Sequence, residues 1–291
     1  MTDIPINNEL LALDGLDAIA FAHAQFTSDV RSLGSGRWQW SAWLNPQGRT
    51  LHFFALLQPL PARLLIWLPR GGASDMAGAL ERFVMRMRVE LRVLGDWASR
   101  MQASCLPDEH GASHACALHA RDGGYLIAQP GPVPRAALLA PMAGARTRKD
   151  DAAMADVLAG LPFLDPSLAG QFLPQALGLE RLDAIRFDKG CYPGQEIVAR
   201  LHFRGGNKQS LVRLRLGGHD MVPTPGTRVL HAGEPVGTIL HGASDPQGDS
   251  ELLATMSTTL FDADRLLVSP DYPVSSLSRE FCSLSHCERS N

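Results

Sequence analysis

The pattern of apolar and polar residues changes at Gly205-Gly206, and this change limits the folds that the chain can adopt. Beyond Asn207, short alternating apolar runs follow one another at close spacing, with turn residues between them. Several short strands of this kind are typical of a small β-barrel or sandwich. The runs are Leu211–Leu216, Thr227–His231, Pro235–Leu240 and Glu251–Met256. We expect residues 207–268 to form a C-terminal β-barrel, and residues 269–291, which are serine-rich and lack periodicity, to form a poorly ordered tail.

The preceding part of the chain begins with a predicted β-hairpin. Alternation places Trp38 and Trp40 on one face of a strand and Trp43 near or on the other. Asn45–Gly48 has the composition of a turn, and Thr50–Leu57 returns as the second strand.

A helix and further strands are expected after this hairpin. Ser74 is a candidate N-cap for a helix that begins at Asp75. The alternation from Met85 to Leu94 predicts a half-buried strand with an arginine-rich outer face. We also expect a strand at Tyr125–Gln129, a proline-rich connection over Pro130–Pro141 and a helix over Asp150–Leu158. This order predicts an α+β fold in which residues 1–206 form two interleaved α+β subdomains with mainly antiparallel sheets.

Composition and charge narrow the class of protein. The 291 residues carry a net charge of −3, and 45% of them are hydrophobic, which is ordinary for a globular chain. This balance gives no whole-protein reason to expect nucleic acid or an anionic membrane as partner. The most apolar stretch, His52 to Pro69, is interrupted by polar residues and prolines, and the N-terminus lacks the features of a secretory signal. We expect a cytoplasmic protein without a membrane span.

The cysteines do not suggest a disulfide framework or a resident metal centre. There are five, and no pair has CxxC spacing: Cys105, Cys116, Cys191, Cys282 and Cys287. An odd, thinly spread set favours free thiols in a reducing compartment. We expect no bound metal.

The stretch from Asp188 to Arg200 has the composition of a constrained functional loop. Pro193-Gly194 fits the two central positions of a type II turn. Gly190 allows close backbone approach before Cys191, and Lys189 is near enough in sequence to favour the thiolate form. We expect Cys191 to be a functional thiol at the edge of this loop.

Three other interpretations of this region remain open. The loop is also compatible with a tight turn that buries an inert cysteine. Cys191 with His202 as base would make a nucleophilic site. The basic residues that follow, with His202 and Phe203 among them, suit a polyanion such as RNA; they are Arg200, Arg204, Lys208, Arg213 and Arg215.

The sequence KGCYPGQE over Lys189–Glu196 resembles the signature of the YgfZ family of folate-binding proteins, which belong to the T-protein, or aminomethyltransferase-like, superfamily. Gly170–Gln175 upstream and Val198–Lys208 downstream resemble that family's flanking segments, and Gln25–Val30 resembles its N-terminal Q-x-T-x-D-V. The similarity covers residues about 8 to 268.

The resemblance implies a T-protein-like folate-binding body followed by a small barrel. It implies a tetrahydrofolate-binding accessory protein that supports iron–sulfur cluster assembly or repair in client enzymes, including tRNA-modifying ones, with weak or indirect tRNA contact. Tetrahydrofolate or a one-carbon derivative would be the ligand. The residues expected to act are Cys191 and Lys189, with Gly190, Tyr192, Gly194, Gln195, Glu196, Arg200, Trp38 and Trp40 in the loop or the folate site.

One departure from the superfamily concerns the aspartate pair that follows the N-x-x-G turn in the T-protein. The turn is retained as Asn45–Gly48, but the matching positions hold His52 and Phe53. A phenyl ring cannot accept a proton, and histidine does so with a different charge and reach. This argues against aminomethyl transfer. A folate-dependent one-carbon transferase and an RNA-binding module remain the alternative functions.

Overall fold

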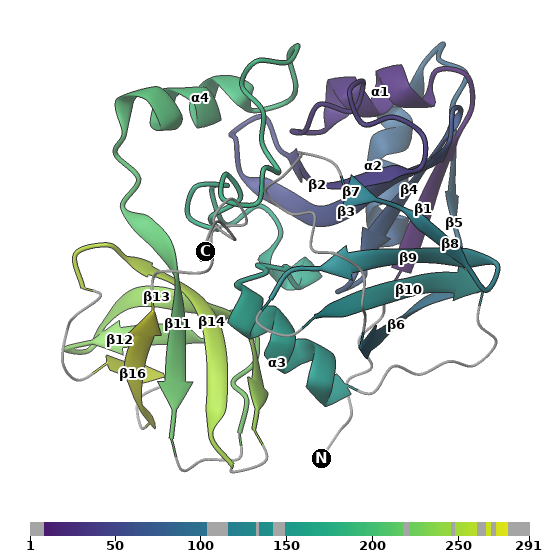
Figure 1. Cartoon of the computed structure of the whole chain (residues 1–291). Coiled ribbons are helices and arrows are strands. Elements are labelled where there is room, and N and C mark those ends of the chain that lie inside the picture. The colour runs from purple at the N-terminus through teal and green to yellow at the C-terminus, as the bar shows by residue number, and fades with distance from the viewer. Residues whose placement is uncertain are drawn as a thin grey trace, which may run out of the picture.

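The structure is a computed structural model of the whole chain, shown in Figure 1. It describes residues 9–103, 116–131, 134–141, 149–217, 221–245, 248–260, 266–268 and 272–278. Within these ranges the chain forms a six-stranded sheet, a four-stranded sheet and a closed barrel.

The first sheet has the strand order β5-β1-β4-β3-β2-β7, and all its pairings are antiparallel. Its strands are β1 (Glu9–Asp14), β2 (Arg37–Leu44), β3 (Thr50–Leu60), β4 (Arg63–Leu68), β5 (Glu90–Val93) and β7 (Cys116–Ala117). The predicted hairpin is confirmed, because β2 pairs with β3 across the Asn45–Gly48 turn.

The predicted alternation in β2 is also confirmed. Trp38 and Trp40 pack in one hydrophobic cluster, on the side of the second sheet, and Trp43 packs in the other, under the helices. Both faces of this sheet are therefore buried, which explains the nearly continuous apolar sequence of its strands.

Two helices cover the outer face of the first sheet: α1 (Ala18–Gln25) and α2 (Ala73–Val84). The predicted cap at Ser74 is wrong. The helix begins earlier, at Ala73, with Gly72 as N-cap, and the side chain of Glu9 accepts a hydrogen bond from the Ala73 amide at 2.7 Å. A carboxylate from the neighbouring strand thus satisfies an amide that a local cap would otherwise bind.

The strand expected over Met85–Leu94 is much shorter. Met85 ends α2 with a φ of 45° and is exposed, and only Glu90–Val93 forms β5 at the sheet edge. Arg88 and Arg92 form ion pairs with Asp17 and Asp14. These pairs engage much of the arginine-rich face.

The second sheet has the order β6-β10-β9-β8 and consists of β6 (Trp97–Ala103), β8 (His119–Arg121), β9 (Gly124–Gln129) and β10 (Arg135–Pro141). The strand at Tyr125–Gln129 is confirmed as β9. The proline-rich connection is wrong for its second half, because Arg135–Pro141 is the buried strand β10. The run Ala136–Ala140 is buried on both faces, and the prolines of this segment lie outside the run.

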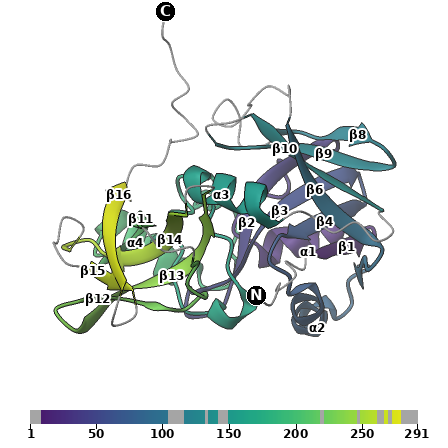
Figure 2. The ribbon, with the colours of Figure 1, turned by 90° about the horizontal axis from the view of Figure 1, so that it is seen from below.

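A helix and an irregular segment join the sheets to the barrel. The predicted helix is confirmed as α3 (Lys149–Ala159), which lies between the second sheet and the barrel in both Figure 1 and Figure 2. After the short 3₁₀ helix η1 (Pro166–Leu168), residues 169–194 run as turns that lead into α4 (Gln195–Arg204).

The barrel has the strand order β11-β14-β13-β12-β15-β16 and is closed, as expected. Its strands are β11 (Gln209–Leu216), β12 (Arg228–His231), β13 (Glu234–Ser244), β14 (Ser250–Ser257), β15 (Leu266–Val268) and β16 (Tyr272–Ser278). The expected tail from residue 269 is wrong for residues 272–278, because β16 pairs with β11 and β15 and closes the barrel. Closure pairs the backbone N–H and C=O groups of edge strands that would otherwise remain unpaired. The remainder of the expected tail lies outside the described residues.

The boundaries that we propose for the domains follow these elements, with residues 1–206 as the body and the barrel from residue 207. Among the described residues, no helix has the length and apolarity needed to cross a membrane.

Candidate functional site

The KGCYPGQE loop is built on a tight turn that runs directly into α4. The Gln195 amide donates to the Tyr192 carbonyl at 3.2 Å, and Gly194 has φ 76° and ψ 1°. These values match the third position of a type II turn, as the sequence predicts. Gly194 is also the N-cap of α4. The loop and the helix therefore form one rigid piece.

Gly194 packs against the Asn45–Gly48 turn from the hairpin of the first sheet. A Cβ at residue 194 would lie 2.5 Å from the Asn45 carbonyl oxygen and 2.6 Å from the Gly48 Cα. Gly48 in turn has a φ of +73°, and a Cβ there would lie 3.0 Å from the Ile197 Cβ. Two glycines are thus needed so that two turns distant in sequence can touch.

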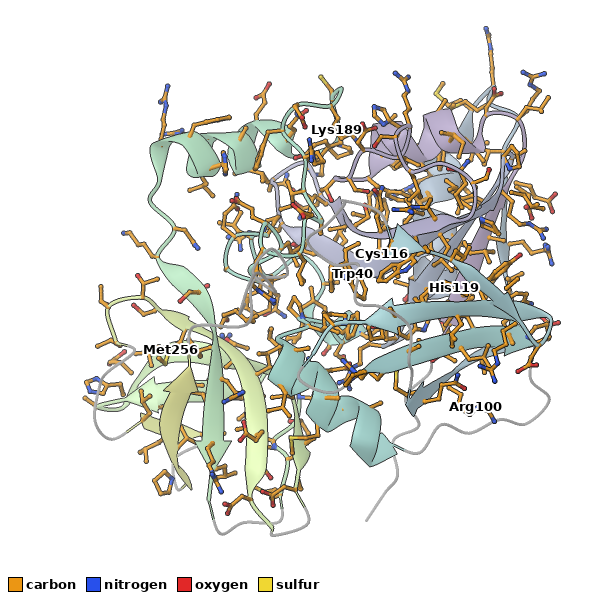
Figure 3. All side chains as sticks on the ribbon, viewed as in Figure 1. Trp40, Arg100, Cys116, His119, Lys189 and Met256 are labelled. Carbon is orange, nitrogen blue, oxygen red and sulfur yellow. The ribbon has the colours of Figure 1, made fainter. Side chains whose placement is uncertain are left out.

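The other end of the loop is fixed by Lys189. Its ammonium group donates three hydrogen bonds to backbone carbonyls, at 2.6 Å to His23, 2.5 Å to Phe26 and 2.9 Å to Ser28. The first two carbonyls belong to the C-terminal end of α1, where a cation is favoured by the helix dipole. Burial lowers the pKa of Lys189 to about 8, while Asp29 acts in the opposite direction. Figure 3 shows Lys189 between the loop and the end of α1.

This geometry gives Lys189 a positioning role. The sequence predicts that its charge acts on Cys191, but its three donors are taken by the carbonyls of residues 23, 26 and 28. Its ammonium nitrogen also lies 5.2 Å from the ring centroid of Tyr192. Lys189 therefore anchors the loop to the helix layer of the first sheet.

The Gly170–Gln175 segment joins the same assembly. Gly170 and Phe172 form backbone hydrogen bonds with Thr50, both at 2.8 Å, and Arg49 donates to the Gln171 carbonyl at 2.5 Å. Gln175 donates to the carbonyl of Val198 in α4 at 3.1 Å. The segments at residues 25–30, 170–175 and 189–196, which carry the resemblance, thus meet around one loop, together with the hairpin turn at residues 45–50.

Cys191 is exposed at this loop, whereas Cys116 is buried in β7. The interpretation of the loop as a turn around a buried cysteine is therefore wrong. Gly190 has ordinary space beside it, since a Cβ there would lie 3.7 Å from the His23 Nε2, so the close approach expected at this glycine is absent.

His202 is not arranged as a base for Cys191. Its Nδ1 pairs with Glu180 at 2.9 Å, and its ring stacks on Phe187 with centroids 4.1 Å apart. No hydrogen bond joins Cys191 and His202 within the described ranges. The nucleophile-and-base interpretation is not supported by this geometry.

A histidine that is not among the predicted site residues lies nearer to the loop. His23 is buried beside Gly190, and its Nδ1 lies 3.2 Å from an Asp29 oxygen. Burial, followed by the charge of Lys189, lowers the pKa of His23. Its position two residues before the Gln25–Val30 segment is the one signal in the sequence that could have indicated it.

The tryptophans expected at a folate site lie deeper. Trp38 and Trp40 are 0% and 3% exposed, and Trp40 packs with Phe53 and Phe163 in an aromatic cluster. Tyr192 and Val198 belong to the same hydrophobic cluster, so the loop and α4 lie on its edge. Figure 3 shows Trp40 in the interior, near Cys116.

The polar residues expected at the folate site are not all gathered with these rings. Gln195 is partly buried, whereas Glu196 and Arg200 are exposed on α4. The structure therefore brings Tyr192 and Gln195 to the cluster's edge and leaves Glu196 and Arg200 outside it.

Several buried polar atoms near this cluster have no hydrogen-bond partner within the described part of the chain. They are the Trp40 Nε1, the Tyr192 hydroxyl and the Gln175 Oε1. An unsatisfied buried polar group costs about 1–3 kcal/mol, so such groups call for a ligand or solvent. The three atoms comprise one donor, one acceptor and one hydroxyl, which are the kinds of polar group that fix a small ligand in a largely apolar site.

Comparison with known proteins finds relatives described as the tRNA-modifying protein YgfZ. The chain is 42% identical over 127 residues to the tRNA-modifying protein YgfZ of Serratia proteamaculans, a match of 42% of this chain and 38% of that protein. It is 28% identical over 222 residues to the tRNA-modifying protein YgfZ of Sodalis glossinidius, covering 69% of this chain and 67% of that protein. The match thus spans well under half of the Serratia protein. No family model matches the chain.

Among solved structures, the chain is similar to glycine cleavage system aminomethyltransferase T from Bartonella henselae. The TM-score is 0.70 at 14% identity, over 96% of this chain and 85% of that one. At this identity the likeness concerns the fold, which is the α+β body and barrel that the sequence predicts. By sequence the chain is thus similar to tRNA-modifying proteins YgfZ, and its fold is similar to that of aminomethyltransferase T.

Proposed function

We propose that this chain is a tetrahydrofolate-binding accessory protein that supports the assembly or repair of iron–sulfur clusters in client enzymes, including tRNA-modifying ones. The observation that carries the proposal is the exposed thiol of Cys191 on a loop anchored at both ends, by Lys189 and by Gly194. An anchored, accessible thiol suits brief contact with a client better than stable storage of a cluster.

The proposed chemistry at Cys191 is transient. Its thiolate would attack the outer sulfur of a donor's persulfide, and the donor's thiolate would leave, so that the sulfur passes to Cys191. Transient binding of iron and thiol exchange with a client are the other forms of the same role. Each requires access to the thiol and none requires a buried base.

The folate part of the proposal rests on the aromatic cluster and its unsatisfied polar atoms. Trp40, Tyr192 and Gln175 would hold the pterin, with Gln195 at the edge. Arg200, exposed on α4, would bind the carboxylates of the glutamate tail. Tetrahydrofolate would supply a carrier for one-carbon groups.

The rival function, aminomethyl transfer, has less support from the site. His52 stacks on Trp43 with centroids 6.1 Å apart, and Phe53 packs on Trp40 and Phe163. Burial lowers the pKa of His52 to about 4, so that it is neutral near pH 7. Neither side chain supplies the negative charge that an aspartate pair would give.

The test of the thiol is complementation in cells that lack the native gene. Cys191→Ala should fail to restore the activity of iron–sulfur client enzymes, whereas Cys116→Ala, a change at a buried thiol, should restore it at equal protein level. Full activity with Cys191→Ala would refute the role of this thiol.

A further inference from the structure

Helix α4 has an outer face that no other part of the described chain covers. Val198 is its one buried residue within the described structure, and Phe203 is 73% exposed. With 3.6 residues per turn, Glu196, Arg200, Phe203 and Arg204 point to the same side, away from Val198. Figure 1 shows α4 at one end of the molecule, above the barrel.

The ring of Phe203 is held in place although it is exposed. It meets His202 edge-on, with centroids 4.8 Å apart and an interplanar angle of 84°, and Phe187 at 5.9 Å and 61°. His202 is itself fixed by its stack on Phe187 and its ion pair with Glu180. Phe203 is therefore a preorganised flat surface that faces solvent.

Basic side chains share the outer face of α4 with this ring and continue just after the helix. Arg200, Arg204 and Lys208 are exposed and form no ion pair within the described ranges. Glu196 is the acidic group on the same face, which leaves an excess of two positive charges among these four residues. An exposed aromatic ring among unpaired cations is the pattern of single-stranded nucleic-acid sites, where bases stack and phosphates are neutralised.

The barrel arginines do not belong to this surface. Arg213 pairs with Glu251 at 3.1 Å, and Arg215 pairs with Asp249. The broad basic stretch that the sequence suggested is thereby reduced to α4 and the residues that follow it.

We propose that the outer face of α4, with Arg200, Phe203 and Arg204, binds single-stranded RNA together with Lys208, which follows the helix; Phe203 would stack on a base and the three cations would contact phosphates. This inference does not rest on the proposed folate and thiol functions, but it shares Arg200 with the proposed site for the folate tail; the test at Phe203, which the folate proposal does not use, separates the two. An α-helix rises about 1.5 Å per residue, so Phe203 lies roughly 12 Å along α4 from Gln195. Gln195 is the residue at which the Cys191 loop enters the helix.

The test is fluorescence anisotropy with a labelled 12-nucleotide oligouridine, and with a tRNA transcript as competitor, at 50 and 200 mM salt. Three phosphate contacts give a salt slope of about −2, so affinity should fall roughly 20-fold between these concentrations. Neutralising Arg200 and Arg204 together, to glutamine, should bring this slope to about −0.7.

The nature of the contact is tested at Phe203. Phe203→Leu keeps an apolar side chain but removes the stacking plane, and it should weaken RNA binding about fivefold or more. Phe203→Trp should retain binding. The matched controls are Phe83→Leu near the end of α2 and Arg86→Gln just after it, which change exposed side chains of the same kinds and should have no effect.

Two results would overturn this inference. One is the absence of salt-dependent RNA binding by the folded protein. The other is RNA binding that Phe203→Leu weakens no more than Phe83→Leu does. This includes the case in which Phe203→Leu abolishes the capture of a client protein and leaves RNA binding unchanged. Tetrahydrofolate binding by the Phe203 variants should be unchanged, which separates this test from that of the proposed function.

Discussion

Replacing Gly194 with alanine tests whether the KGCYPGQE loop is locked onto the hairpin turn. The new Cβ would lie 2.5 Å from the Asn45 carbonyl oxygen, 2.6 Å from the Gly48 Cα and 2.7 Å from the Gly48 nitrogen. All three are backbone atoms, so no side chain can rotate to make room. Either the loop or the turn must move.

The expected cost has two parts. A positive φ of 76° costs an alanine about 1–2 kcal/mol relative to glycine. Forcing packed backbone apart adds about 1–3 kcal/mol. The matched control is Gly123→Ala, in the two-residue turn between β8 and β9, at a φ of +75° with no atom within 4 Å of the new Cβ, which incurs only the first part.

Urea unfolding of the wild type and both variants measures these costs. Gly194→Ala should lower the free energy of unfolding by about 2–5 kcal/mol, and Gly123→Ala by about 1–2 kcal/mol. Equal losses in the two variants would refute the contact between the loop and the turn.

Lys189→Met should lower the free energy of unfolding by about 1–3 kcal/mol near pH 7, because carbonyls at the end of α1 lose a charged donor. The pKa of Lys189 is 10.5 in the unfolded chain and falls to about 8 in the folded state, so between pH 8 and 10.5 the unfolded state binds more protons and the wild type should gain stability relative to this variant. A difference in unfolding free energy that does not change with pH over this range would contradict the burial of Lys189. His52 has a lowered pKa of about 4, so wild type should lose stability as pH falls from 6.5 to 4, and His52→Phe should lose less in the same acid titration. Iodoacetamide followed by peptide mapping should label Cys191 in the native protein and Cys116 only after unfolding; early labelling of Cys116 would contradict the burial of β7.

Local patterns predicted the elements whose signals lie within the element itself. The Asn45–Gly48 hairpin, the helix α3 and the barrel strands β11 to β14 follow from alternation, turn residues and helix formers. The turn at Pro193-Gly194 also follows, because proline and glycine meet its φ requirement directly.

The errors arose where a distant segment decides the outcome. Glu9, not Ser74, satisfies the start of α2, and β10 is a strand because β6 and β9 flank it on both sides. The expected tail contributes β16 because the barrel needs a strand beside β11. No local pattern contains these partners.

The candidate site also combines features that local sequence predicts with features that distant segments decide. Cys191, Lys189 and Gly194 do belong to one loop, as the sequence predicts, but Lys189 binds the α1 carbonyls where an effect on the thiol was expected. Trp40 and Arg200, expected together at the folate site, are separated by the fold into a buried cluster and an exposed helix face. Only the fold reveals which charges remain unpaired.

The central claim, a folate-binding accessory protein, is tested most directly by anaerobic titration with tetrahydrofolate. Tryptophan fluorescence, corrected for ligand absorbance, reports on the cluster around Trp40, and Trp40→Phe identifies its share of the signal. We predict saturable binding at micromolar ligand that Gly194→Ala weakens. Absence of binding by the folded wild-type protein would contradict the claim.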